Sequence, residues 1–338
     1  MADDDKNTNW KVYHGDGKVE PARLGNLPDP PPWRDFANLA RVRGSNFKIP
    51  PGVVEVVNAA LYLRRPILVT GDPGVDKSSL AYSIAYELDL GQVLSWNINS
   101  RSTLTEGLYQ YDAIARLRDV SFERRAGDRK SGEDTEERKQ KPEDIGRYIK
   151  LGPLGTAYAA TGNPRVVLID EIDKSDIDLP NDLLHVFENG DFEIPELVRM
   201  ADTSRNVSVT TAEVDKNDVP KRVDVESGHV RCKVFPFVII TSNGERELPP
   251  AFLRRCLRVD IPKPGNEQLA DIAKAHLPTA DAAVLATLIT EFDRRRKEGA
   301  TLATDQLLNI FFLISRGKPI GNDDRAILEP ALLRDLNR

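Results

Sequence analysis

Eight consecutive residues in the first quarter of the chain have the types and spacing of a phosphate-binding loop. They read Gly71-Asp72-Pro73-Gly74-Val75-Asp76-Lys77-Ser78, and Ser79 follows them as a further candidate for nucleotide binding. In the P-loop pattern, GxxxxGK followed by Ser or Thr, glycines let backbone N–H groups face an anion at the start of a helix. Lys77 would reach the β- and γ-phosphates of a nucleotide, and the Ser78 hydroxyl would help to hold Mg²⁺.

One position departs from this pattern, because Asp76 stands where the second glycine is expected. A carboxylate that points at a triphosphate costs electrostatic energy, whereas an acid in the first turn of a helix is stabilising when it points to solvent. We therefore expect Asp76 to affect turnover more than the fold. The loop by itself leaves two interpretations open, a nucleotide site and an ordinary strand-to-helix turn.

Short apolar runs that end in polar residues predict the strands that would position this chemistry. The run Ile67–Thr70 leads into the loop, Val166–Ile169 ends in Asp170 and Glu171, and Phe237–Ile240 continues into Thr241-Ser242-Asn243. Four apolar residues in a row are typical of a buried parallel strand. Because functional groups in such sheets gather at the carboxyl ends of the strands, we expect these polar residues to face the nucleotide side of the sheet.

Each of these polar residues suits a step of phosphate chemistry. Asp170 would organise Mg²⁺ and its waters, and Glu171 would polarise an attacking water; acids that merely cap the next helix are the alternative. Asn243 would hydrogen-bond that water or the γ-phosphate. Arg254 and Arg255 follow downstream, and an always ionised arginine supplied by an adjacent subunit would offset charge in the transition state.

The bulk composition bounds the class of protein. The chain has 338 residues, of which 40% are hydrophobic, and it carries a net charge of −6 with a pI near 5.5. This balance does not favour nucleic acid as a partner. Cys232 and Cys256 lack metal-ligand spacing and are interpreted as reduced structural thiols. Because no apolar run has membrane-spanning length and the start is not signal-like, we expect a cytoplasmic protein.

Changes in composition predict three segments. Residues 1–48 form an N-terminal extension, 49–262 an α/β nucleotide-binding core and 263–338 a small helical lid. Within the core, the charged stretch near 122–144 cannot bury a face and is expected to be a mobile surface insertion, either solvated or in contact with a partner.

The N-terminal extension contains a proline-rich run, Leu27–Trp33, which predicts an extended polyproline II segment. Such a segment supplies neither a sheet ladder nor a helix. It either packs against the core or a neighbouring subunit, with Trp33 and Phe36 as anchors, or remains a solvated linker.

The order of P-loop, Asp-Glu strand, polar-ended strand and paired arginines resembles that of the AAA+ ATPases. Finer stretches resemble the MoxR-like branch: Ser102-Thr103-Leu104-Thr105-Glu106-Gly107, Leu151-Gly152-Pro153-Leu154 and Val234-Phe235-Pro236-Phe237. The resemblance covers about residues 49–315. It implies an α/β fold, namely a P-loop αβα sandwich with a parallel sheet, followed by a small C-terminal helical lid.

The resemblance also implies roles for single residues. Asn243 would be the sensor on its strand, and Arg255 aligns better than Arg254 with the family's arginine finger. Gln306 stands where a second sensor arginine is expected. A neutral amide can hydrogen-bond a phosphate but cannot offset its charge.

The function implied by the resemblance is ATP-driven remodelling of another protein. ATP and Mg²⁺ would be the cofactors, and the chain would assemble as a homo-oligomer, most simply a hexameric ring. MoxR-like proteins commonly act with von Willebrand factor A domain partners, and similar proteins occur in bacterial defence loci. The region near 192–233 would be the hairpin before the sensor strand, and 122–144 would occupy the insertion region of the second helix.

Two other functions stay open. One is a nucleotide-responsive scaffold that binds ATP but hardly hydrolyses it, a reading that Asp76 and Gln306 favour. The other is a nucleic-acid motor of the same superfamily, against which the negative net charge argues.

Overall fold

The computed structural model describes residues 10–127, 142–278, 281–316, 320 and 322–335. These residues form two compact units. The smaller unit gathers the described residues of Met1–Pro50, Gly71–Ser83 and Ile261–Arg338, and the larger unit those of Pro51–Thr70 and Ile84–Asp260. The P-loop segment therefore groups with the C-terminal helices rather than with the strands.

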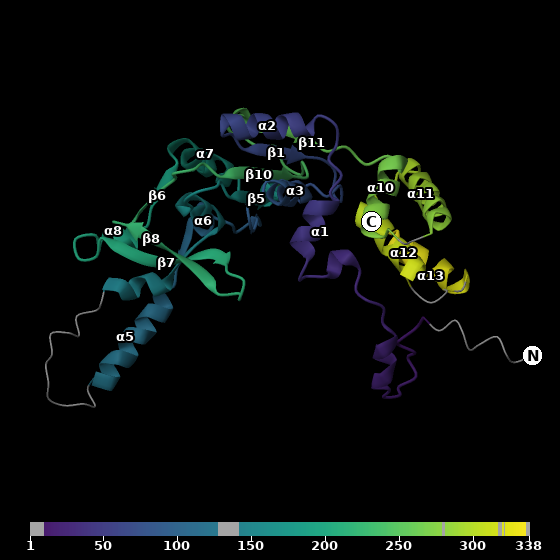
Figure 1. Cartoon of the computed structure of the whole chain (residues 1–338), viewed down its shortest axis with the longest axis horizontal. Helices are drawn as coiled ribbons and strands as arrows, with labels where there is room; N and C mark the ends of the chain where they lie inside the picture. Colours follow the sequence, from purple (N-terminus) through teal and green to yellow (C-terminus); the bar gives the residue numbers. More distant parts are fainter. Residues whose placement is uncertain (1–9, 128–141, 279–280, 317–319, 321, 336–338) are drawn as a thin grey trace, which may run out of the picture. The chain divides into compact units, whose positions relative to one another are not determined.

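The larger unit contains a five-stranded parallel sheet in the order β11-β1-β10-β5-β2 (Figure 1). Its strands are β1 (Ile67–Thr70), β2 (Leu94–Asn97), β5 (Val166–Asp170), β10 (Phe237–Ser242) and β11 (Leu257–Asp260). The apolar runs of β1, β5 and β10 are buried on both faces, as parallel strands covered by helices must be. The three strands predicted to carry the chemistry are confirmed.

Helices pack on this sheet in the larger unit. Helix α2 (Val53–Leu63) contacts β11, α6 (Pro153–Ala159) contacts β2 and β5, and α7 (Leu179–Asn189) contacts α9 (Pro250–Arg255). Side chains of the sheet and of α6, α7 and α9 share one apolar core, which includes Leu68, Leu154, Ile169 and Leu183. The chain has the predicted α/β fold, a P-loop αβα sandwich with a parallel sheet and with further helices at the C-terminal end.

A second sheet of the larger unit has the order β3-β4-β7-β8-β9-β6. Its strands are β3 (Tyr109–Tyr111), β4 (Ile149–Leu151), β6 (Asp191–Glu193), β7 (Asn206–Val214), β8 (Pro220–Glu226) and β9 (His229–Arg231). Strands β7 and β8 pair antiparallel and form the hairpin of the region near 192–233. Short helical segments lie next to these strands in the chain: α4 (Leu104–Leu108) precedes β3, η4 (Pro142–Tyr148) precedes β4, and α8 (Pro195–Val198) lies between β6 and β7. A further short turn, η5 (Ile172–Lys174), follows β5 of the parallel sheet.

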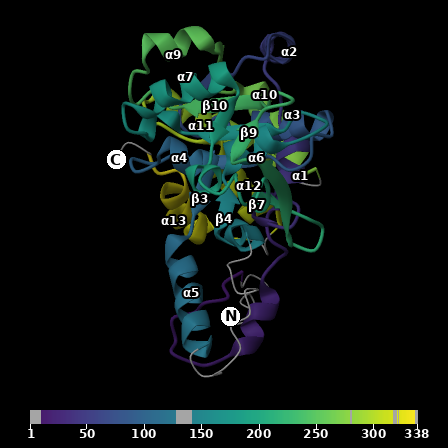
Figure 2. The ribbon, with the colours of Figure 1, turned by 90° about the vertical axis from the view of Figure 1, so that its left-hand side faces the viewer.

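The charged stretch near 122–144 begins as a helix rather than as the expected loop. Residues 122–127 continue helix α5 (Ala113–Gly127), whereas residues 128–141 lie outside the described part of the chain. Helix α5 projects from the body of its unit in both views (Figures 1 and 2). Ile114, Leu117 and Phe122 are exposed on it. A helix therefore continues into this stretch while Phe122 stays exposed.

The smaller unit is built from helices. They are α1 (Leu39–Asn46), α10 (Asn266–His276), α11 (Ala282–Lys297), α12 (Thr304–Arg316) and α13 (Asn322–Leu332), with the short turns η1 (Pro21–Asn26) and η2 (Pro32–Arg34). Helix α3 (Ser79–Glu87) begins in this unit. Leu269, Phe292, Leu307 and Phe311 lie in its apolar core.

The N-terminal extension packs on the core of the smaller unit through one of its two predicted anchors. Trp33 donates a hydrogen bond from Nε1 to Asn309 Oδ1 over 3.0 Å, and its ring lies edge-on to His276 and Phe312. Phe36 is 75% exposed, so it is not an anchor on the core of its own chain. The extended polyproline run ends at Pro31, earlier than the predicted end at Trp33, because Pro32–Arg34 forms a 3-10 turn.

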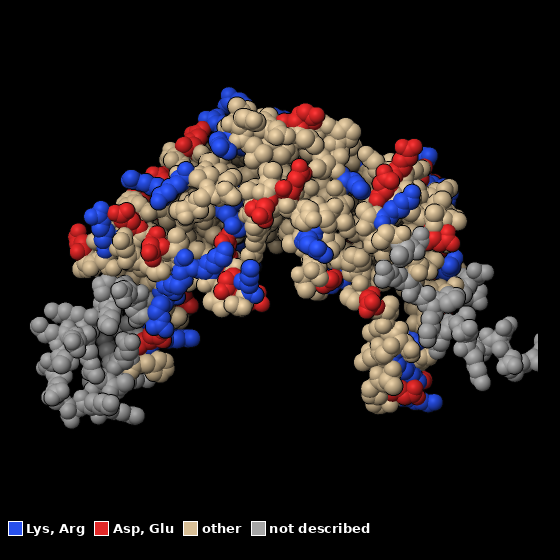
Figure 3. Space-filling model, viewed as in Figure 1, with Lys and Arg blue, Asp and Glu red and all other residues tan. Residues whose placement is uncertain are grey.

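Three further properties bear on the class of protein. Within the described residues, no helix is both long and apolar enough to cross a membrane. Cys232 and Cys256 are free, and burial raises the pKa of the Cys256 thiol to about 12, as expected for a structural thiol. On the face drawn in Figure 3, acidic and basic side chains are interspersed.

Candidate active site

The P-loop follows β1 in the chain and leads into α3, and its glycines stand where a side chain does not fit. A Cβ on Gly74, whose φ is +79°, would lie 2.2 Å from the Ala303 Cβ. A Cβ on Gly71 would lie 2.5 Å from the Ile261 carbonyl oxygen. Thr304 N–H donates to the Gly74 carbonyl over 3.3 Å. Two distant segments of the chain thus hold the first half of the loop.

Lys77 lies within the loop and is held by the loop's own backbone. Its ammonium donates to the carbonyl oxygens of Gly71 and Asp72 over 2.9 Å and 3.0 Å, and the residue is only 7% exposed. An ammonium fixed in this way is ready to donate charge-assisted hydrogen bonds to a phosphate. The structure therefore places the Lys77 ammonium inside the loop, and its contact with a phosphate stays a prediction.

Asp76 has a left-handed backbone conformation, which explains why the P-loop pattern has a glycine at this position. Its φ is +63°, in the left-handed region that glycine enters freely and that Asp enters more readily than most residues. The side chain is exposed, and Oδ1 accepts a hydrogen bond from the Ser79 hydroxyl over 2.7 Å. The carboxylate is thus engaged at the start of α3, where a negative charge stabilises the helix.

The other predicted loop residues differ in burial. Asp72 and Pro73 are exposed, Ser78 is partly buried, and Val75 and Ser79 are buried.

A single buried hydroxyl organises the acids at the end of β5. Thr241 Oγ1 donates to Asp170 Oδ1 over 2.6 Å and accepts the Glu171 N–H over 2.9 Å. Thr241 lies on β10, which pairs in parallel with β5, and it is 1% exposed. The sequence pattern indicates no role for Thr241 beyond its place near the carboxyl end of an apolar strand; the available signal was a hydroxyl that directly follows four apolar residues.

Glu171 leaves β5 in an unusual backbone conformation. Its φ is +62°, a region that costs most side chains about 1–2 kcal/mol. Glu171 Oε2 pairs with Lys174 Nζ at 2.7 Å, and Oε1 lies 3.5 Å from Asn243 Nδ2. The hydrogen bond from Lys174 to Glu171 raises the pKa of the lysine. The structure therefore brings together three predicted residues, Asp170, Glu171 and Asn243.

Asp173 is a second residue that the sequence analysis missed. It is 3% exposed, and its Oδ2 accepts the N–H groups of Asn243 and Glu245, each over 3.0 Å. A carboxylate that accepts two backbone N–H groups fixes the chain that leaves β10. Asp173 thereby holds the backbone of Asn243, two residues beyond Thr241.

Chain connectivity relates this cluster to the P-loop. Thr70, the last residue of β1, pairs with Ser242 on β10, and Gly71 is bonded directly to Thr70. The loop therefore begins at the carboxyl edge of the sheet, the same edge at which β5 presents Asp170 and Glu171.

The two predicted metal ligands have the donor chemistry that Mg²⁺ takes. Asp170, in the larger unit, offers a carboxylate, and Ser78, in the smaller unit, offers a hydroxyl; both are hard oxygen ligands. Among the described residues, no group of three or more His, Cys, Asp or Glu could hold a metal ion by itself.

The two candidate arginines end α9 and differ in their partners. Arg255 donates from Nε to Glu188 Oε1 over 2.8 Å, and its Nη2 lies 2.6 Å from the same oxygen. Arg254 is exposed, and its guanidinium has no hydrogen bond or ion pair with the described residues. Arg65 donates to the carbonyl oxygens of both. Arg254 therefore has its donors available, whereas Arg255 is engaged within its own chain.

Gln306 is engaged within the smaller unit. Its Oε1 accepts the Ala303 N–H over 2.9 Å, and its Nε2 donates to the Arg334 carbonyl over 2.8 Å. Both ends of the amide thus stabilise the start of α12. A bound phosphate would have to displace these bonds to reach Gln306.

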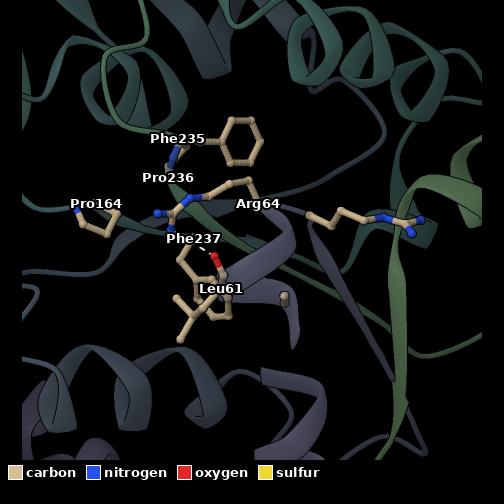
Figure 4. A pocket seen from close by; sticks show the side chains of 8 residues that line it. Leu61, Arg64, Pro164, Phe235, Pro236 and Phe237 are labelled. Atoms are coloured by element: carbon tan, nitrogen blue, oxygen red, sulfur yellow. Dashed lines mark hydrogen bonds between the residues drawn. The ribbon is translucent and has the colours of Figure 1, made fainter. Parts of the chain in front are cut away.

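A small hollow at the opposite edge of the sheet is not a candidate site. Figure 4 shows Leu61, Arg64, Pro164 and Phe237 around it, and Arg64 donates to the Leu61 carbonyl over 2.9 Å. Its volume of about 10 Å³ is that of about one water molecule. Pro164 and Phe237 mark the amino ends of β5 and β10, whereas the acids stand at the carboxyl end.

The comparison with protein families matches this domain. The model described as "AAA domain (dynein-related subfamily)" matches residues 66–256, which include β1, the P-loop, the acid cluster and the paired arginines and make up more than half of the chain. Among the curated proteins, no sequence matches. The chain belongs to the AAA family, in the dynein-related subfamily.

Proposed function

We propose that the chain binds and hydrolyses ATP in the presence of Mg²⁺. The observation that carries this proposal is the network around Thr241, in which one buried hydroxyl fixes both the Asp170 carboxylate and the Glu171 backbone. Glu171 also has a left-handed backbone conformation, a kind of strain that clusters at functional sites. Membership of the AAA family supports the same chemistry.

The proposed roles follow from the contacts of each residue. Lys77 and the N–H groups of the loop bind the phosphates. Glu171 takes a proton from the attacking water, and Asn243, 3.5 Å from the Glu171 carboxylate, orients that water. Ser78 and Asp170 would hold Mg²⁺, which supplies neutralisation of phosphate charge when bound.

An arginine from an adjacent copy of the chain would complete the site. The resemblance to the AAA+ ATPases favours Arg255 as this arginine. The contacts within the chain favour Arg254, because the Arg255 guanidinium must first break its ion pair with Glu188. Separate Arg254→Ala and Arg255→Ala variants decide between them. The variant that lowers turnover without weakening nucleotide binding by the same chain identifies the finger.

The test of the proposal is phosphate release from ATP, measured beside nucleotide binding. We expect Lys77→Ala to lose both, and Glu171→Gln to keep binding while turnover falls about 100-fold or more, as for loss of a general base. Glu193→Gln, an exposed position on β6, is the matched control and should turn over ATP as the unsubstituted chain does. Equal turnover by Glu171→Gln and the control would refute the assignment.

We further propose that turnover drives the remodelling of a partner protein, as in the MoxR-like branch that the sequence resembles. The chain would act as a homo-oligomer, in the simplest case a hexameric ring, on a client or a von Willebrand factor A domain partner. Native mass spectrometry with a non-hydrolysable ATP analogue measures the stoichiometry directly. A chain that stays monomeric with nucleotide bound would contradict this proposal.

A second candidate function is a nucleotide-responsive scaffold with little hydrolysis. Two observations favour it: Asp76 places a carboxylate in the loop, and both ends of the Gln306 amide are engaged. Binding of ATP without measurable phosphate release, in the presence of Mg²⁺ and at concentrations that allow assembly, would favour the scaffold over the hydrolase.

A further inference from the structure

The P-loop of this chain has an unfavourable charge balance for an anion site. It carries two carboxylates, Asp72 and Asp76, and one ammonium, Lys77. The loop therefore has a negative net charge before any phosphate arrives. A triphosphate adds several more negative charges, so tight binding calls for a further cation beside the loop.

Lys263 lies beside the loop, in the segment that follows β11. Its ammonium is 3.2 Å from Asp72 Oδ2. The segment is fixed on both sides of Lys263. Ile261 packs against Gly71, and Arg296 Nη1 donates to the Pro264 carbonyl over 3.1 Å. The backbone of Lys263 is therefore held against the first half of the loop, while its side chain remains able to move.

Two other polar residues of the smaller unit are less able to serve. Gln306 is neutral, and both ends of its amide are bonded. The guanidinium of Arg296 donates to the Pro264 and Leu302 carbonyls and lies 4.4 Å above the Phe292 ring. These contacts hold the Arg296 guanidinium in place, so that it is less able than Lys263 to reorient toward a phosphate.

We propose that Lys263 is a phosphate-binding residue, whose ammonium exchanges the Asp72 carboxylate for a phosphate oxygen of the bound nucleotide. This inference rests on the proposed nucleotide site and assigns to Lys263 the charge that Gln306 lacks. The side chains of Lys263 and Asp72 are 44% and 53% exposed. Because half-exposed ion pairs contribute little net stability, the exchange costs little.

The experiment measures the affinity of the full chain for a fluorescent ATP analogue. We expect Lys263→Gln to weaken binding about tenfold, the effect of one charge-assisted hydrogen bond, and Lys263→Arg to restore most of it. Lys274→Gln, an exposed position on α10 in the same unit, is the control and should bind as the unsubstituted chain does. Unchanged binding by Lys263→Gln would overturn the proposal.

A double-mutant cycle separates phosphate binding from a merely structural ion pair. If Lys263 only fixes Asp72, replacing it in the Asp72→Asn background has no further effect. If Lys263 binds phosphate, Lys263→Gln weakens binding about tenfold in that background as well. Loss of all nucleotide binding by the unsubstituted chain would overturn the proposed function and this inference together, whereas normal binding with no effect of Lys263 overturns the inference alone.

Discussion

The P-loop and the acid cluster are held in place by different means. The loop is shaped by backbone groups, since Lys77 donates to carbonyl oxygens and Gly74 accepts the Thr304 N–H. The acid cluster is shaped by buried side chains, the Thr241 hydroxyl and the Asp173 carboxylate. Where backbone contacts shape a region, as in the loop, they limit which residue types fit at each position. Where buried side chains shape it, as in the acid cluster, the functional residues depend on which side chains surround them.

This difference explains why one region is easier to recognise than the other. A loop that needs glycines at fixed places carries its signature within a few consecutive residues. A carboxylate positioned by a hydroxyl on the neighbouring strand carries no such local signature, because its partner is 71 residues away. Substitutions that change the backbone in one region and a buried side chain in the other test this comparison.

The largest effect is expected from Gly74→Ala. The new Cβ would meet Ala303 at 2.2 Å and displace the loop, and displacement of a binding group by about 1 Å can cost about 100-fold. We expect loss of binding of the ATP analogue. Gly52→Ala is the matched control, because Gly52 has nearly the same φ, +80°, and open space around it. Equal binding by the two variants would mean that the contact with Ala303 does not shape the loop.

Thr241→Val is expected to lower turnover by about 10- to 100-fold, as for loss of a residue that orients a catalytic group. Valine keeps the shape of the strand but leaves Asp170 Oδ1 and the Glu171 N–H without their shared partner, which costs about 1–3 kcal/mol of stability for each group. Phosphate release at saturating ATP and the free energy of unfolding measure the two effects. Thr241→Ser retains the hydroxyl and should retain most activity; a serine variant as slow as the valine variant would contradict the role of the hydroxyl.

A smaller gain is expected from changes at Asp76. Asp76→Asn removes the charge, tolerates the left-handed backbone and can still accept from Ser79. We expect about two- to fivefold tighter binding of the ATP analogue, because one exposed charge near the phosphates acts through a high dielectric. Asp76→Gly should also raise turnover. If neither variant differs from the unsubstituted chain, the carboxylate does not act on the nucleotide.

The smallest effect on chemistry is expected from Trp33→Ala. Loss of the hydrogen bond to Asn309 and of two edge-on ring contacts should lower the free energy of unfolding of the smaller unit by about 1–3 kcal/mol. Turnover at low temperature should stay within about twofold, since Trp33 touches neither region compared above. Phe36→Ala, at an exposed position, is the control for thermal unfolding. Equal destabilisation by both variants would show that Trp33 is no anchor.

The sequence by itself determined the strands β1, β5 and β10 and the polar residues at their ends. Runs such as Val166–Ile169 are long and apolar enough to be buried parallel strands, and the polar residues that end them stand at the carboxyl edge. Asp170, Glu171 and Asn243 were found in this way, because strand direction alone places them together.

Only the tertiary structure decided which groups support these residues. Thr241 and Asp173 act through hydrogen bonds whose partners lie 70 or more residues away, and no local pattern encodes such a pairing. The same holds for Trp33 and Phe36, two aromatic residues three positions apart, of which one is packed and one exposed. Whether a side chain is buried depends on which distant segments of the chain pack against it. The burial of Trp33 and the exposure of Phe36 therefore cannot be predicted from the few residues around them.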